Sequence, residues 1–187
     1  MRVTSVLGNL NDPSYEILLR RELGGFFETD ELALEWDEAR GAGLSRATAR
    51  GRVIELARAD GEEPLQDGDV LACDRSGAVP VAVVVRLRTA EALLVEVDRA
   101  KPLALAQACW EIGNMHAPLF EGDSDERTVR VLTPAMPVVE RMLAGIPGLA
   151  LSKRTVSLDP SRRFTSSATE VVVGFSADFN IVKKARA

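Results

Sequence analysis

The sequence predicts an α+β protein in which an N-terminal all-β domain, a small barrel or sandwich, precedes a ferredoxin-like βαββαβ domain. Two observations carry this prediction. Short apolar runs separated by frequent turn residues fill the first part of the chain, as in small β domains. Farther on, strand-like and helix-like apolar periods follow each other in the order strand, helix, strand, strand, helix, strand. We therefore expect a β domain at 1–87, a second domain at 88–160 and a basic C-terminal tail at 161–187.

The first domain is expected to contain several short strands. Residues 15–23 suit a helix and a strand equally, and the sequence leaves that choice open. Glycine-containing turns separate four short apolar runs, at 32–36, 53–56, 70–73 and 81–85.

The second domain begins with an expected strand and helix. Apolar and acidic residues alternate around 93–97, which indicates a strand. Pro102 suits the first turn of a helix because it has no N–H to lose, and apolar residues at helical spacing follow as far as Ile112. Gly113 and Asn114 are the residues best suited to a left-handed C-terminal cap, so we expect the helix to stop there.

A hairpin, a second helix and a last strand complete the domain. Apolar runs at 117–120 and 128–132 flank a polar turn, which predicts the hairpin. Thr133 and Pro134 are expected to begin the second helix, as N-cap and first helical residue. A strand at 149–158 follows. In this plan both helices cover one face of the sheet, and the other face is free to meet a partner.

The tail is expected to be basic, because its lysines and arginines outnumber its acidic residues by three. Residues 170–175 within it are a candidate edge strand.

Composition and charge exclude several classes of protein. With 46% hydrophobic and 27% charged residues, the chain is an ordinary globular protein. A net charge of −5 disfavours nucleic acid as a partner. The longest apolar run, 78–85, is far short of the roughly 20 residues of a membrane helix. With two cysteines and no secretory signal, we expect a cytoplasmic protein with neither a nucleic-acid nor a membrane partner.

His116 is the single histidine of the chain, so every histidine-dependent mechanism must pass through it. It directly follows the expected helix end, where a side chain can project from the fold. An ordinary surface histidine, or a core histidine with its hydrogen bonds satisfied, is the alternative interpretation. A two-fold dimer would bring two copies of His116 together. Two imidazoles with oxygen ligands suit nickel or copper, with zinc close behind.

The other candidate residues have simpler explanations. Cys109 is expected to be a small buried apolar residue, and Met115 to pack or be exposed. Gly41-Ala42-Gly43 lacks a following helix and a phosphate-binding lysine. No nucleophile has a base near it, so we do not expect an enzyme. A solvated hairpin tip explains the acidic cluster of Glu121, Asp123, Asp125 and Glu126.

Residues 103–119, LALAQACWEIGNMHAPL, resemble the signature helix and following loop of the urease accessory protein UreE family. Gly113, Asn114, His116 and Pro118 match the family pattern, and Met115 stands where the family has arginine. Similarity continues through VLTPAMPVVERMLAGIPGLAL, which is like the family's second helix, and upstream through LQDGDVL.

The resemblance implies a nickel metallochaperone of urease maturation. It implies an N-terminal β domain likened to a peptide-binding chaperone domain, and a ferredoxin-like domain that binds metal and forms a homodimer. His116 of each protomer would bind one shared nickel ion, with copper and zinc as competitors. Nickel would pass to the apo-urease complex directly or through the urease accessory GTPase.

Two departures from the family are visible. The chain lacks the His-rich tail of many members, so storage of several nickel ions is not expected. Glu111 stands where many members carry a further histidine. With one imidazole per chain, a metal-independent adaptor for urease assembly is the alternative function.

Overall fold

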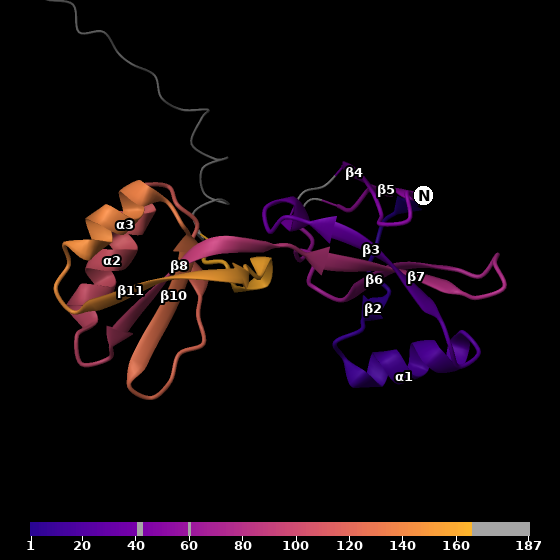
Figure 1. Cartoon of the computed structure of the whole chain (residues 1–187), viewed down its shortest axis with the longest axis horizontal. Coiled ribbons are helices and arrows are strands. Elements are labelled where there is room, and N and C mark those ends of the chain that lie inside the picture. Colours follow the sequence, from indigo (N-terminus) through magenta and orange to yellow (C-terminus); the bar gives the residue numbers. More distant parts are fainter. Residues whose placement is uncertain (41–42, 60, 166–187) are drawn as a thin grey trace, which may run out of the picture.

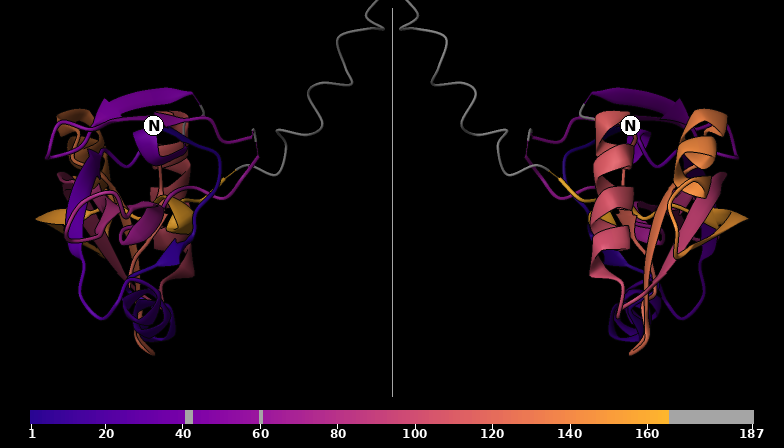
Figure 2. Two further views of the ribbon diagram at one scale, coloured as in Figure 1. Left: turned by 90° about the vertical axis from the view of Figure 1, so that its right-hand side faces the viewer. Right: turned by 90° about the vertical axis from the view of Figure 1, so that its left-hand side faces the viewer.

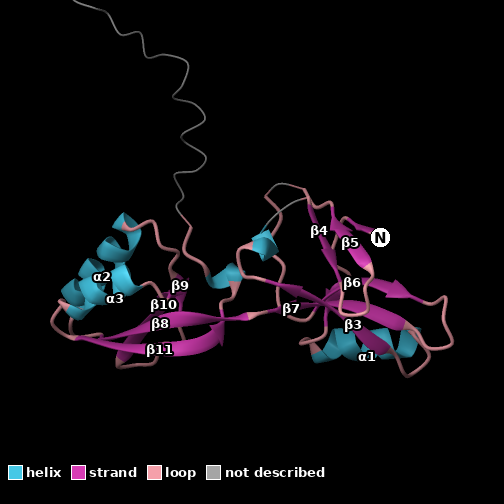
Figure 3. Cartoon of the chain, turned by 45° about the horizontal axis from the view of Figure 1, so that its top comes forward, coloured by secondary structure: helices cyan, strands magenta, loops and turns pink. Residues whose placement is uncertain are grey.

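A computed structural model describes residues 1–40, 43–59 and 61–165 of the chain (Figure 1). They form a mixed α+β fold, which confirms the predicted class. Two lobes lie side by side, an N-terminal lobe (1–87) and a C-terminal lobe (89–165). Strands β7 (Val81–Leu87) and β8 (Thr89–Asp98) connect them, as Figure 3 shows.

The N-terminal lobe contains two sheets. The first has the order β1-β5-β4 and the second has the order β2-β6-β7-β3. Alternation along β7 explains how both pack. Val83 and Val85 face the core shared with the first sheet, whereas Ala82 and Val84 face the opposite side. The other strand bounds are β1 (Arg2–Val3), β2 (Gly8–Asn9), β3 (Glu28–Leu34), β4 (Leu44–Ala47), β5 (Val53–Leu56) and β6 (Asp69–Asp74).

The expectation of an all-β first domain is wrong, because the second sheet is covered by helix α1 (Pro13–Glu22). This helix resolves the open choice at 15–23. The Asp12 carboxylate accepts a hydrogen bond from the backbone N–H of Ser14, and Pro13 occupies the first turn. Leu19 and Leu23 are buried against the sheet. An amphipathic helix fits here because one face of the sheet would otherwise be left apolar and exposed.

The C-terminal lobe follows the expected order of elements. After β8 come α2 (Pro102–Asn114), β9 (Phe120–Glu121), β10 (Thr128–Pro134), α3 (Pro137–Ala144) and β11 (Leu149–Ser157). The sheet order is β11-β8-β10-β9, with every neighbouring pair antiparallel. Both helices lie on one face of this sheet, and Figure 2 (right) shows them side by side.

The second helix of this lobe begins later than expected. Thr133 and Pro134 lie in β10, where they pair with Leu93 and Ala92 of β8, and Pro137 takes the first helical position. Strand pairing therefore prevails over the local capping signal. Thr133 is completely buried.

The chain beyond β11 turns back across the sheet edge. Residues Pro160–Arg162 form a 3-10 helix, and Arg163 forms an antiparallel β-bridge with Phe120. The candidate edge strand at 170–175 lies outside the described residues. Among the described residues, no helix has the length and apolar character needed to cross a membrane.

Candidate functional site

His116 lies just beyond the C-terminal end of α2. The helix buries Ala108 and Ile112 in the core of the C-terminal lobe. Its opposite face exposes Leu103 and Trp110, whose exposed fractions are 84% and 63%. His116 is itself exposed. The site is therefore an imidazole at the surface beside an unusually apolar helix face.

The backbone at the end of α2 forms a Schellman cap. The N–H of His116 donates to the carbonyl of Gly113 at 2.9 Å, and the N–H of Ala117 donates to the carbonyl of Ile112 at 3.2 Å. Ile112 and Ala117 also share the apolar core of the lobe, as the motif requires. This geometry fixes the direction in which the chain leaves the helix.

The left-handed residue of this cap is His116, with a φ of 51°. The expectation that Gly113 or Asn114 would hold this conformation is wrong, because both remain in the helix. The contact of the half-buried Ala117 with the core sets where the helix ends, and Ala117 lies four residues after Gly113. His116 is the one non-glycine residue with positive φ among the described residues. A non-glycine residue in this region is strained, and such strain is concentrated at functional sites.

Cys109 and Met115, the two sulfur-containing residues near His116 in the sequence, are both at least partly buried. Cys109 is half-buried in α2, and burial raises the pKa of its thiol, which favours the protonated form. Met115 packs against the core of the C-terminal lobe. Both positions agree with the simpler explanations expected for them.

The acidic hairpin tip is held by hydrogen bonds of its own. The Asp125 carboxylate accepts from the backbone N–H groups of Arg127 and Thr128, and these bonds, followed by one from Arg130, lower its pKa. Asp123 forms an ion pair with Arg162 at 2.7 Å. Across the described part of the chain, no three His, Cys, Asp or Glu side chains gather as metal ligands would.

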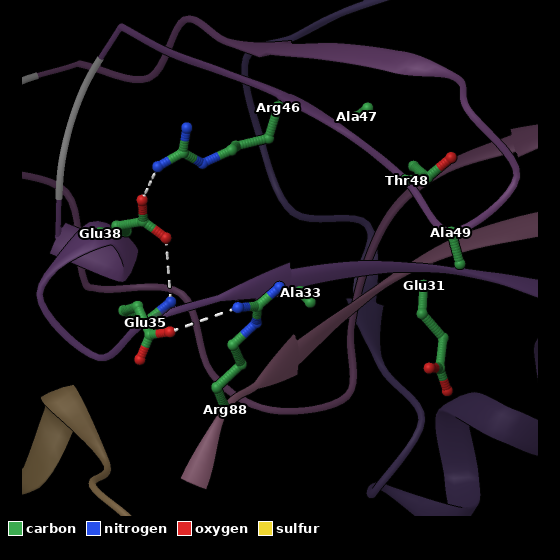
Figure 4. A pocket seen from close by; sticks show the side chains of 9 residues that line it. All are labelled: Glu31, Ala33, Glu35, Glu38, Arg46, Ala47, Thr48, Ala49 and Arg88. Atoms are coloured by element: carbon green, nitrogen blue, oxygen red, sulfur yellow. Dashed lines mark hydrogen bonds and ion pairs between the residues drawn. The ribbon is translucent and has the colours of Figure 1, made fainter. Parts of the chain in front are cut away.

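A groove of about 600 Å³ opens in the N-terminal lobe between strands β3 and β4 (Figure 4). Each of these strands lies at the edge of its sheet. The edges meet at one end, where the N–H of Ala49 donates to the carbonyl of Glu31 at 2.8 Å. Between them the groove is lined by the small side chains of Ala33 and Ala47. Of the Gly41-Ala42-Gly43 triplet, residues 41 and 42 lie outside the described residues.

Charged residues close the other end of the groove. The Glu38 carboxylate accepts a hydrogen bond from the backbone N–H of Glu35 at 3.0 Å and forms an ion pair with Arg46 of β4. The bond from Glu35 is the main reason that the pKa of Glu38 is lowered. Arg88 approaches Glu35 at 3.6 Å. Sequence reasoning missed this groove because nothing local shows that two strand edges face each other.

Comparison with known proteins points to one family. The model for the C-terminal domain of the UreE urease accessory protein matches residues 92–172, a span that includes His116. The urease accessory protein UreE of Helicobacter pylori (strain HPAG1) is 26% identical over 164 residues, which cover 84% of this chain and 90% of the relative. UreE of Helicobacter acinonychis (strain Sheeba) is similar to the same extent. UreE of Acetivibrio thermocellus is 29% identical over 124 residues, or 66% of this chain and 71% of the relative.

Proposed function

Because the chain belongs to the UreE family of urease accessory proteins, we propose that it carries nickel and delivers it to apo-urease during assembly of the active site. The family is one of accessory proteins, and the chain is not an enzyme. Nickel is the cargo, and copper and zinc are the competing ions. The observation that carries the proposal is an exposed His116, held in a left-handed conformation at the end of α2.

A homodimer gives the bound metal ion a second imidazole ligand. The chain has one histidine, and a two-fold axis near His116 brings in the same residue of a second copy. The outer face of α2 supports such an interface, because Trp110 near the His116 end and Leu103 in the first turn both expose large apolar side chains along it. An ion shared by two histidines, with water or carboxylate oxygens, exchanges more readily than one in a closed structural cage.

Each lobe has its own role: one binds metal and the other binds a protein partner. The C-terminal lobe, a ferredoxin-like domain at 88–160, binds metal and dimerises. The N-terminal domain at 1–87 binds an extended segment of a urease-assembly partner, either the accessory GTPase or the apo-urease complex. The groove between β3 and β4 supports this role, since two sheet-edge strands face each other across it and can offer main-chain hydrogen bonds to an added strand between the Ala49–Glu31 bond and the charged end. We propose that the transfer of nickel to urease takes place in the cytoplasm.

The alternative is an adaptor that assembles urease components without its own metal. The groove is compatible with both functions, so nickel binding separates them. A carrier binds nickel through His116, whereas an adaptor holds its partners without it.

Calorimetric titration of nickel into the full chain tests the proposal. We expect one ion per dimer in the parent, and a loss of affinity of at least about a hundredfold in His116→Ala. Gln107→Ala, also exposed on α2, is the control and should bind as the parent does. Equal nickel binding by the parent and His116→Ala would move the site elsewhere. No binding by either chain would favour the adaptor.

A further inference from the structure

One aromatic side chain of the N-terminal lobe packs into the C-terminal lobe. The ring of Trp36 meets the ring of Phe120 edge to face, with centroids 5.3 Å apart and an interplanar angle of 86°. Phe120 is only 1% exposed, and it shares an apolar cluster with Ala92 and Leu158. The two lobes are therefore joined by a packed contact as well as by the chain.

Phe120 is closely linked to the loop that carries His116. It begins β9, four residues after the histidine, and pairs with Leu132 of β10. On the other edge of β9, Phe120 bridges to Arg163, and the N–H of Phe164 donates to the carbonyl of Leu119 at 2.8 Å. The loop is thus fixed by the Schellman cap at its start and by Phe120 at its end.

Trp36 is equally closely linked to the groove between β3 and β4. It lies between Glu35 and Glu38, two residues that line the groove. The Glu38 carboxylate binds the backbone N–H of Glu35, which closes the turn that carries Trp36. The same carboxylate pairs with Arg46 on the opposite strand edge. One side chain therefore holds both the turn and the end of the groove.

Two cations complete the junction between the lobes. The guanidinium of Arg163 lies 5.6 Å from the centroid of the Trp36 ring. Arg40, in the 3-10 helix after Trp36 (Glu38–Arg40), donates to the carbonyl of Pro160 at 3.2 Å. Trp36 is thus held between Phe120, which begins the strand that follows the His116 loop, and Arg163, which forms a β-bridge with Phe120.

We propose that Trp36 is a positioning residue for His116, and that it couples the groove to the metal-binding loop. A strand that enters the groove competes with Arg46 for Glu38, and the turn that carries Trp36 shifts. Trp36 passes this shift to Phe120 and to the loop. A partner seated in the groove thereby changes the affinity of His116 for its metal. By linkage, bound metal changes the affinity of the groove by the same factor. Nickel at His116 and a partner strand in the groove both rest on the proposed function, whereas the structural link from Arg46 and Glu38 through Trp36 to His116 does not.

The test uses the single histidine as a reporter. Because the chain has one imidazole, its Cε1–H resonance in NMR spectra reports on His116 alone, without metal. Arg46→Ala opens the end of the groove, and we expect it to shift this resonance. In a Trp36→Ala background the same substitution should shift it by at least about threefold less. Trp36→Phe should restore most of the shift, because it keeps an aromatic ring against Phe120.

The matched control is Arg20→Ala. Arg20 also forms an ion pair in the N-terminal lobe, and its side chain is 49% exposed, as is that of Arg46. It should leave the His116 resonance where it is. Circular dichroism and urea unfolding verify that each variant folds. Should Trp36→Ala fail to fold, Trp36→Leu keeps an apolar side chain and removes the ring.

Two results would overturn the coupling. Either Arg46→Ala leaves the His116 resonance unmoved in the parent, or it moves the resonance equally with and without Trp36. Nickel titration is a separate measurement. A parent that binds nickel without this coupling disproves only the positioning role of Trp36. A coupled His116 that binds no nickel disproves only the carrier function.

Discussion

His116 holds a backbone conformation that glycine adopts with less strain, yet this residue carries the proposed chemistry. Its position is set by the hydrogen bonds of the Schellman cap and by the packing of the half-buried Ala117 against the core. The left-handed region disfavours side chains with a Cβ by roughly 1–2 kcal/mol. Stability alone would favour glycine here, so a histidine at this position argues for a role beyond folding.

Replacing His116 with glycine should therefore stabilise the fold while removing the imidazole. We expect the free energy of unfolding to rise by roughly 0.5 kcal/mol, because the strain relieved in the folded state exceeds the entropy that glycine adds to the unfolded chain. Urea denaturation measures this change. Nickel binding should be lost in the same variant, as in His116→Ala.

Gly113→Ala is the companion variant that keeps the histidine. Gly113 is helical, and an added Cβ would meet no atom within 4 Å. Alanine should thus raise the free energy of unfolding by about 0.5–1 kcal/mol. Destabilisation by Gly113→Ala would mean that Gly113, rather than His116, holds the left-handed conformation.

At the scale of elements, the hairpin from β9 to β10 depends on one carboxylate. The Asp125 carboxylate accepts hydrogen bonds from two backbone N–H groups of the turn, and it forms an ion pair with Arg130. These contacts keep its pKa below the ordinary value. A carboxylate with a lowered pKa stabilises the folded state where it is charged, and the benefit is lost as the pH falls.

Asp125→Asn should therefore flatten the acid limb of the stability profile. In the parent, the contribution of Asp125 is fully present above the ordinary aspartate pKa of about 4 and disappears as the pH falls below it. The variant lacks this contribution at neutral pH and has less to lose in acid. Urea unfolding between about pH 3 and 7 measures the difference. Glu126→Gln, at the same hairpin tip, is the control and should leave the profile as it is.

At the scale of the whole molecule, the exposed face of α2 bears on assembly. Leu103 and Trp110 lie opposite the buried face of the helix, Leu103 in its first turn and Trp110 near the end that leads to His116. An apolar helix face of this kind, continuous with a proposed shared ligand, fits an interface between two copies.

Trp110→Glu should convert the proposed dimer into monomers, because it puts a charge on the exposed apolar face that the dimer would bury. Sedimentation or light scattering measures the mass in solution. Phe26→Glu is a matched control, since Phe26 is 62% exposed on the other lobe and Trp110 is 63% exposed. A parent that is monomeric at all concentrations would contradict a nickel site shared across an axis.

Local sequence determined much of this protein. The apolar periods predicted the order of strands and helices in the C-terminal lobe, because each element needs one face toward a core. The single histidine and the Gly-Asn-x-His pattern predicted His116 as the metal ligand and indicated the resemblance to the UreE family without any structure. These are properties of neighbouring residues, and a sequence displays them directly.

Tertiary structure decided what depends on distant contacts. Burial on a sheet made residues 13–22 a helix, and pairing with β8 kept Thr133 and Pro134 in a strand. Packing of Ala117 made His116, and not the expected Gly113, the left-handed residue at the end of α2. The groove and the contact between Trp36 and Phe120 join residues far apart in the chain. No local sequence pattern predicts such contacts, because the two partners come together only when the chain has folded.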